Sequence, residues 1–182
     1  MHSALPTLPG VTNQLREVGL EFLKDAPNSW DFEAEVHAPP KVVFAAIAAD
    51  PSTWTRWFPG LERGSYEGDG EPGVGTRREV SMDGVTYRET MLAFDEPTRW
   101  AYRVDESSGD MFHALAEDWV VEPAGDHAVV RWTFAIDPKP EIVPLLGALP
   151  EIVGKVFADA MAGLNAYIEQ QGGHQGGEHG AG

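Results

Sequence analysis

From Gly60 to Asp137 the sequence alternates apolar and polar residues with a period of two, the pattern of strands that bury one face. Turn-forming segments interrupt this alternation at short intervals: EGDGEPGVG, DG, DEPT, DESSGD and PAGD. Strands joined by such short connections pair antiparallel, because a parallel pair needs a long crossover. This part of the chain therefore predicts a meander of about six antiparallel strands.

A further strand and two short helices are expected before the meander. The segment WDFEAEVH, from Trp30 to His37, alternates so that its aromatic and aliphatic side chains share one buried face. The prolines at positions 39 and 40 favour a helix start, because the first helical turn leaves its N–H groups unpaired. Asp50 is placed to cap a second helix, which Pro59-Gly60 ends.

Three aromatic residues crowd the second short helix, in the segment DPSTWTRWFPG. Trp54, Trp57 and Phe58 recur at helical spacing, which places them on one face of the helix. That face must meet an apolar surface. We expect Trp54 and Phe58 to pack in the core, with Trp57 a candidate for the mouth of a cavity.

The N-terminal segment carries a helical signal of its own. Val11, Leu15, Val18 and Phe22 recur at helical spacing. We therefore expect residues 1–28 to form a leader that contains a short amphipathic helix.

The C-terminal segment predicts a long helix followed by a tail. Apolar residues recur at helical spacing from Ile152 to Ile168, which is typical of a helix with a wide buried stripe. Residues 172–182 are rich in glycine and are expected to be disordered. The folded domain is accordingly expected to span residues 29–171.

The turn chemistry predicts which side chains point inward. An Asp-Gly pair between two strands favours a two-residue hairpin turn, which here sets Met82 opposite Val85. Counting back along both strands then sets Arg78 opposite Glu89, on the apolar face. A turn around Ala124-Gly125 gives the last hairpin an inward face as well: His113, Leu115, Glu117, Trp119, Val121, Val130, Trp132, Phe134 and Ile136. An aromatic face with a few polar side chains indicates a ligand cavity rather than a solid core.

Charge and composition exclude several classes of function. The 182 residues include 29 acidic and 13 basic side chains, so the net charge of -16 opposes binding to nucleic acids or anionic membranes. No apolar run approaches the roughly 20 residues that span a bilayer, and the start lacks a signal-peptide pattern. We therefore expect a cytoplasmic protein without membrane insertion. The absence of cysteine excludes disulfides and thiolate nucleophiles.

The segments HAPPKVVFAAIAADPSTWTRWFPG, GVGTRREV and YRETMLAFDEPTRWAYRV, with the final helix, resemble the START/birch-pollen-allergen superfamily (SRPBCC). Within it they are most similar to the polyketide cyclase/dehydrase and lipid-transport branch. The resemblance covers Trp30 to about Gln171. It implies an α+β helix-grip fold: a curved antiparallel sheet of about seven strands around a long C-terminal helix, with two short helices between strands one and two. Members bind lipids, sterols or polyketides between sheet and helix, and some are enzymes without a shared catalytic residue.

The inward face and the implied cavity together give a set of candidate ligand-binding residues. They are Trp57, Arg78, Val80, Tyr87, Glu89, Met91, Trp100, Tyr102, His113, Leu115, Glu117, Trp119, Trp132, Phe134, Phe157 and Met161. The candidates for acid/base catalysis are Glu89, His113, Tyr87 and Arg78. The Arg78–Glu89 pair has two interpretations, either an exposed ion pair worth about 0–1 kcal/mol or a cavity-facing pair that orients a ligand.

Three functions are compatible with these observations. The leading hypothesis is non-covalent binding, with or without transport, of a hydrophobic small molecule such as a lipid or polyketide. The second is an aromatase or cyclase that needs only a shaped cavity and one acid/base group. The third is a protein-interaction module that recruits a basic partner through its acidic surface. No cofactor is expected: GEPGVGT lacks the lysine of a phosphate-binding loop, and the histidines do not assemble a metal site.

Overall fold

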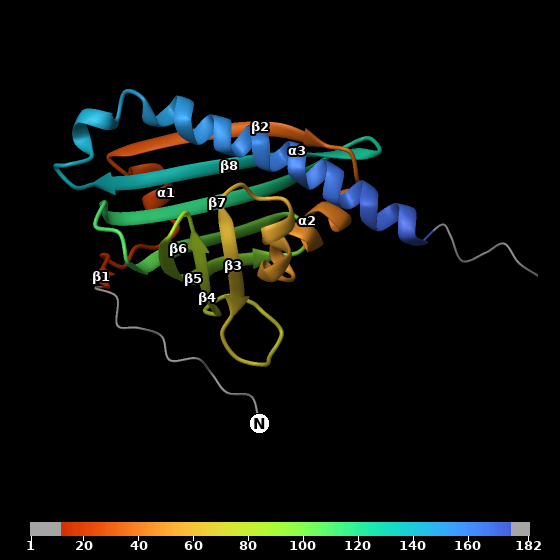
Figure 1. The fold of residues 1–182 in the computed structure, drawn as a ribbon, viewed down its shortest axis with the longest axis horizontal. Coiled ribbons are helices and arrows are strands. Elements are labelled where there is room, and N and C mark those ends of the chain that lie inside the picture. Colours follow the sequence, from red (N-terminus) through yellow and green to blue (C-terminus); the bar gives the residue numbers. More distant parts are fainter. Residues whose placement is uncertain (1–11, 176–182) are drawn as a thin grey trace, which may run out of the picture.

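The computed structural model describes residues 12–175, which form one antiparallel sheet with a long helix across one of its faces (Figure 1). The seven main strands follow the order β2-β8-β7-β6-β5-β4-β3. Their bounds are β2 Asn28–Val36, β3 Leu61–Tyr66, β4 Arg77–Met82, β5 Val85–Asp95, β6 Arg99–Ser107, β7 Phe112–Ala124 and β8 His127–Pro138. The α+β helix-grip fold and the meander of six strands from β3 to β8 are thereby confirmed.

The helices lie where the sequence places them. Helix α2 (Pro40–Ala48) and the 3-10 helix η1 (Pro51–Arg56) connect β2 to β3, and a second 3-10 helix, η2 (Val143–Leu145), precedes α3 (Leu149–Gln175). The Asp50 carboxylate accepts a hydrogen bond from the Ser52 N–H at 2.9 Å, which confirms Asp50 as the N-cap of η1. Helix α3 runs along the sheet and passes close to α2 (Figure 1).

The β4–β5 hairpin has the register that its turn predicts. Asp83 and Gly84 both adopt positive φ, at 49° and 79°, as a two-residue hairpin turn of this kind requires. Met82 pairs with Val85, and Arg78 pairs with Glu89. The polar pair therefore points toward the same face as the apolar residues around it.

The leader differs from the expected amphipathic helix. Its helix, α1, covers only Phe22–Asp25, while Asn13–Gln14 form a short strand, β1, that pairs with β6. The Leu15 N–H donates to Asp105 O and the Arg16 N–H donates to His113 O, so the leader bridges β6 and β7. Backbone carbonyl groups of β6 and β7 thus accept hydrogen bonds from the leader, and these bonds hold the leader extended. The predicted position of Val11 lies outside the described residues.

The C-terminal helix is longer than expected. Helix α3 continues to Gln175, so the predicted domain boundary at residue 171 falls inside it. The rest of the predicted tail, residues 176–182, lies outside the described residues.

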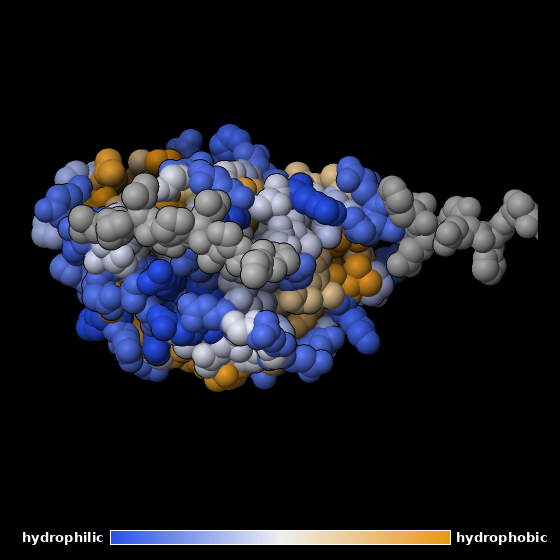
Figure 2. Space-filling view, turned by 60° about the horizontal axis from the view of Figure 1, so that its bottom comes forward, coloured by the Kyte–Doolittle hydropathy of each residue, from blue (hydrophilic) through white to orange (hydrophobic). Residues whose placement is uncertain are grey.

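The surface of the molecule is largely polar on one face. The face seen in Figure 2 is mostly hydrophilic, with small separate apolar patches. No helix within residues 12–175 is both long and apolar enough to cross a membrane. In the same part of the chain, no group of three or more histidine, aspartate or glutamate side chains is arranged to hold a metal ion.

Helix α3 approaches the backbone of η1 so closely that it needs a glycine at the crossing. A Cβ atom at Gly163 would lie 2.3 Å from the carbonyl oxygen of Trp57, whereas a Cβ at Gly172 would meet nothing within 4 Å. We expect Gly163→Ala to lower the free energy of unfolding by about 1–3 kcal/mol, because backbone atoms must move. Gly172→Ala should leave it unchanged or raise it by up to about 1 kcal/mol. Urea unfolding of both variants checks this, and equal stabilities would contradict the close crossing.

Candidate functional site

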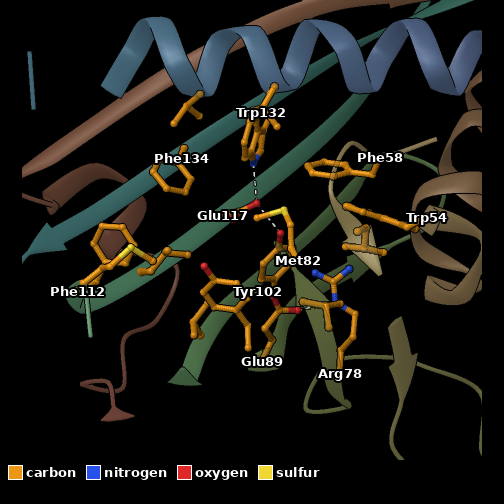
Figure 3. A pocket seen from close by; sticks show the side chains of 18 of the residues that line it. Trp54, Phe58, Arg78, Met82, Glu89, Tyr102, Phe112, Glu117, Trp132 and Phe134 are labelled. Carbon is orange, nitrogen blue, oxygen red and sulfur yellow. Dashed lines mark hydrogen bonds and ion pairs between the residues drawn. The ribbon is translucent and has the colours of Figure 1, made fainter. Parts of the chain in front are cut away.

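A cavity of about 220 Å³ lies between the concave face of the sheet, η1 and the first turns of α3 (Figure 3). Most of its lining is apolar: Trp54, Phe58, Leu61, Val80, Met82, Val104, Met111, Phe112, Leu115, Trp132, Phe134, Leu149, Val153 and Val156. Five polar side chains interrupt this lining: Arg78, Tyr87, Glu89, Tyr102 and Glu117. A mostly apolar cavity with a few polar groups is the usual form of a small-molecule site.

The Arg78–Glu89 pair lies in the wall of the cavity and not at an exposed edge of the sheet. Arg78 Nε donates to Glu89 Oε2 at 2.5 Å, and the two side chains are only 2% and 4% exposed. The Arg78 guanidinium also stacks on three rings, at 5.0 Å from the ring centroid of Trp54 and 4.5 Å from those of Trp100 and Tyr102. The interpretation as an exposed ion pair is therefore wrong, and the pair faces the cavity.

Burial and pairing act in opposite directions on the two charges. Burial raises the pKa of Glu89, and the neighbouring Arg78 opposes that rise. Burial by itself would lower the pKa of Arg78, but Glu89 outweighs it, so the pKa of Arg78 lies above its ordinary value. Each charge is therefore tolerated in the wall because the other is there.

Glu117 on β7 is the second buried carboxyl group of the cavity. Tyr102 on β6 pairs with it across the sheet and donates its hydroxyl to Glu117 Oε2. Trp132 on β8 donates its indole N–H to the same oxygen at 2.8 Å (Figure 3). Burial raises the pKa of Glu117 to about 7. A carboxyl group of this kind exchanges protons near neutral pH, which suits both ligand recognition and acid/base chemistry.

The two tyrosines of the lining stay protonated at neutral pH. Burial raises the pKa of Tyr87 to about 12, and it raises the pKa of Tyr102 well above the ordinary value. Both hydroxyls are therefore neutral hydrogen-bond donors in the cavity wall.

Nine of the sixteen residues predicted to bind a ligand line this cavity. They are Arg78, Val80, Tyr87, Glu89, Tyr102, Leu115, Glu117, Trp132 and Phe134. All nine come from the strands, where the period of two and the hairpin registers define the inward face.

His113 was expected in the cavity and among the catalytic candidates, but its side chain is exposed. The β7–β8 register shifts between Phe112 and Ala114, which marks a β-bulge. Because a bulge inserts one residue into the alternation, Phe112 lines the cavity and His113 turns outward. His113 is therefore not part of the site.

Six other predicted binding residues lie in the core and not in the cavity lining: Trp57, Met91, Trp100, Trp119, Phe157 and Met161. Trp57 is 4% exposed and is covered by α3 at Gly163. Trp54 and Phe58 pack in the core as expected and also line the cavity, whereas Trp57 does not lie at its mouth. Trp119 lies behind the cavity wall, stacked on Trp132 with 5.2 Å between ring centroids.

Sequence reasoning missed several lining residues. Leu149, Val153 and Val156 lie on the first turns of α3, and their helical spacing was available in the sequence. Choosing them over Phe157 and Met161 requires the angle at which α3 crosses the sheet, which periodicity does not supply.

Comparisons with known proteins agree with the fold. The sequence profile of the family described as polyketide cyclase / dehydrase and lipid transport matches residues 29–169. An uncharacterized protein of Mycobacterium tuberculosis is 30% identical over 119 residues, which cover 65% of this chain and 71% of that protein. A START superfamily protein from Mycobacterium smegmatis has a TM-score of 0.61 at 16% identity, covering 79% of this chain and 98% of the other. Ara h 8.0201 has a TM-score of 0.59 at 17% identity, with the same coverage of 79% and 98%.

Proposed function

Because the chain belongs to the polyketide cyclase/dehydrase and lipid-transport family, we propose that it binds a hydrophobic small molecule in the cavity between the sheet and α3. The observation that carries this proposal is the lining itself, in which aromatic and aliphatic side chains surround five polar groups. When an apolar ligand replaces water against this enclosed apolar surface, the free energy of binding becomes more favourable. The family description supports the ligand class, and the apolar cavity supports the location of the site.

The size of the cavity restricts the ligand. Its volume of about 220 Å³ is below the range of roughly 300–1,000 Å³ that is usual for drug-sized ligands. We therefore favour a compact ligand, such as a polyketide fragment of two or three rings, over a long-chain lipid held entirely inside.

Filling the cavity from α3 should weaken binding. Val153 lines the cavity, while the adjacent Ile152 is 56% exposed. We expect Val153→Phe to weaken binding of the neutral fluorescent probe N-phenylnaphthylamine by about tenfold or more, because the larger ring occupies the ligand's space. Ile152→Phe adds the same atoms outside the cavity and should bind like the wild type. A fluorescence titration of the three proteins checks this, and equal binding by both variants would place the probe elsewhere.

A second function, a cyclase or dehydratase, is favoured by one observation. Glu117 combines a carboxyl group of pKa about 7 with a position in the cavity lining, which are the requirements for a general acid or base. Glu89, Tyr87 and Arg78 also line the cavity. Turnover of a ligand extracted from the purified protein, lost in Glu117→Gln while binding persists, would favour the enzyme over the carrier.

A further inference from the structure

The two carboxyl oxygens of Glu117 differ in their hydrogen bonds. Its two hydrogen bonds, from Tyr102 and Trp132, both end on Oε2. Within residues 12–175 no hydrogen-bond partner contacts Oε1. Oε1 nevertheless keeps accessible surface, unlike the indole nitrogen of Trp119, which is sealed and without a partner among the described residues. Since Glu117 lines the cavity, Oε1 is available to whatever occupies it.

The groups around Glu117 do not replace this missing partner. The titratable and charged groups that act on Glu117 come from the sheet: Tyr102 on β6, Tyr87 and Glu89 on β5, and Arg78 on β4. Arg78 is engaged with Glu89. The remaining wall near the helices carries no ionisable side chain. It consists of Trp54 in η1, Phe58 between η1 and β3, and Leu149, Val153 and Val156 in α3. Oε1 is therefore an acceptor open to a ligand in a mostly apolar wall, with the Tyr87 hydroxyl as a second polar group in the same lining.

The protonation state of Glu117 decides what this contact offers. Two wall donors already occupy Oε2, so the neutral form favours a proton on Oε1. The carboxylic acid then presents an O–H donor to the cavity, while the carboxylate presents an acceptor. With a pKa of about 7, both forms are populated near neutral pH.

We propose that Glu117 Oε1 is the polar contact of the cavity's ligand, a compact flat molecule with one hydroxyl or carbonyl group. The carboxylate form selects a hydroxyl-bearing ligand, and the carboxylic acid form selects a carbonyl-bearing ligand. This inference rests on the proposed function, because it specifies the polar end of the hydrophobic ligand in the same cavity.

Three matched probes test the selection: naphthalene, naphthol and acetonaphthone. Their dissociation constants are measured by competition with N-phenylnaphthylamine at about pH 6 and about pH 8, on either side of the Glu117 pKa. At about pH 8 we expect naphthol, whose hydroxyl is still protonated, to bind roughly tenfold more tightly than naphthalene. At about pH 6 this advantage should shrink, and acetonaphthone should bind roughly fivefold more tightly than at about pH 8. Naphthalene should bind equally at both values.

Glu117→Gln is the matched variant, because its amide oxygen can accept from Tyr102 and Trp132 while its N–H₂ group takes the place of Oε1. It should behave as a permanent acid form, with acetonaphthone binding independent of pH and no preference for naphthol at about pH 8. If naphthalene binds but the hydroxyl preference is absent or survives in Glu117→Gln, this inference is wrong and the proposed function stands. If no probe displaces or binds, the proposed function is wrong and this inference with it.

Discussion

Replacing Arg78 by methionine should lower the free energy of unfolding by about 3–5 kcal/mol at neutral pH. The substitution leaves the Glu89 carboxyl, 4% exposed, without its counter-charge in the wall of an apolar cavity. It also removes the guanidinium that stacks on Trp54, Trp100 and Tyr102. The loss should be smaller in acid, because a protonated Glu89 needs no counter-charge.

Arg131→Met is the matched control for this experiment. Arg131 pairs with Glu33 at 2.9 Å, but the two side chains are 41% and 57% exposed. Water screens an exposed pair of this kind, so its loss should change the stability little. The double variant Arg78→Met, Glu89→Met should recover part of the stability, because no lone charge remains buried. Urea unfolding followed by tryptophan fluorescence measures all four proteins, and equal losses for Arg78→Met and Arg131→Met would contradict a buried pair.

Glu117 should make the protein less stable as the pH rises toward neutrality. Its pKa is about 7 in the folded protein against 4.5 as a free side chain, so the folded state binds this proton more tightly. The stabilisation is complete below about pH 4.5 and is lost as the pH rises through about 7. The difference corresponds to roughly 3 kcal/mol, at about 1.4 kcal/mol for each pKa unit.

Glu117→Gln should remove this dependence, because an amide does not titrate. The variant should have nearly the wild-type stability below about pH 4.5, exceed it increasingly between about pH 5 and about pH 7, and keep a constant excess above that. Burial also raises the pKa of Glu89, but that group is present in both proteins, so their difference reports on Glu117. Urea unfolding at several pH values measures the two curves. Parallel curves would mean that Glu117 titrates normally and is not enclosed by the cavity wall.

Local chemistry was sufficient to predict much of the fold. The Asp83-Gly84 turn determines the register of its hairpin, and that register places Arg78 opposite Glu89. Proline and aspartate positions likewise predict η1 and its N-cap at Asp50. These features depend on residues close together in the chain, which is why the sequence alone was informative.

The errors arose where distant parts of the chain decide the outcome. His113 turns outward at a β-bulge, and no turn-forming residue in the sequence marks the position of that bulge. The helical spacing of Leu15 and Val18 in the leader is misleading, because these residues are buried in two different clusters. Leu15 packs with strand residues on either side of the β6–β7 gap, so tertiary contacts override the local periodicity.

The chemistry of Glu117 was predictable only in part. The alternation in β7 predicts that Glu117 lies on the inward face and that it binds a ligand. Tyr102 and Trp132 both donate to one oxygen of this carboxyl group. That arrangement requires β6, β7 and β8 to pair in the observed register. Pairing of this kind depends on side-chain directions across the sheet, which a single sequence does not define.

The proposed function requires that the cavity between the sheet and α3 holds one hydrophobic molecule for each chain. Native mass spectrometry of the protein incubated with N-phenylnaphthylamine measures this, because it counts bound molecules and separates one specific site from surface adsorption. We expect a single added probe mass on the wild type and on Ile152→Phe, and the bare chain mass for Val153→Phe. A bare mass for the wild type, or the same probe stoichiometry on all three proteins, would contradict the claim.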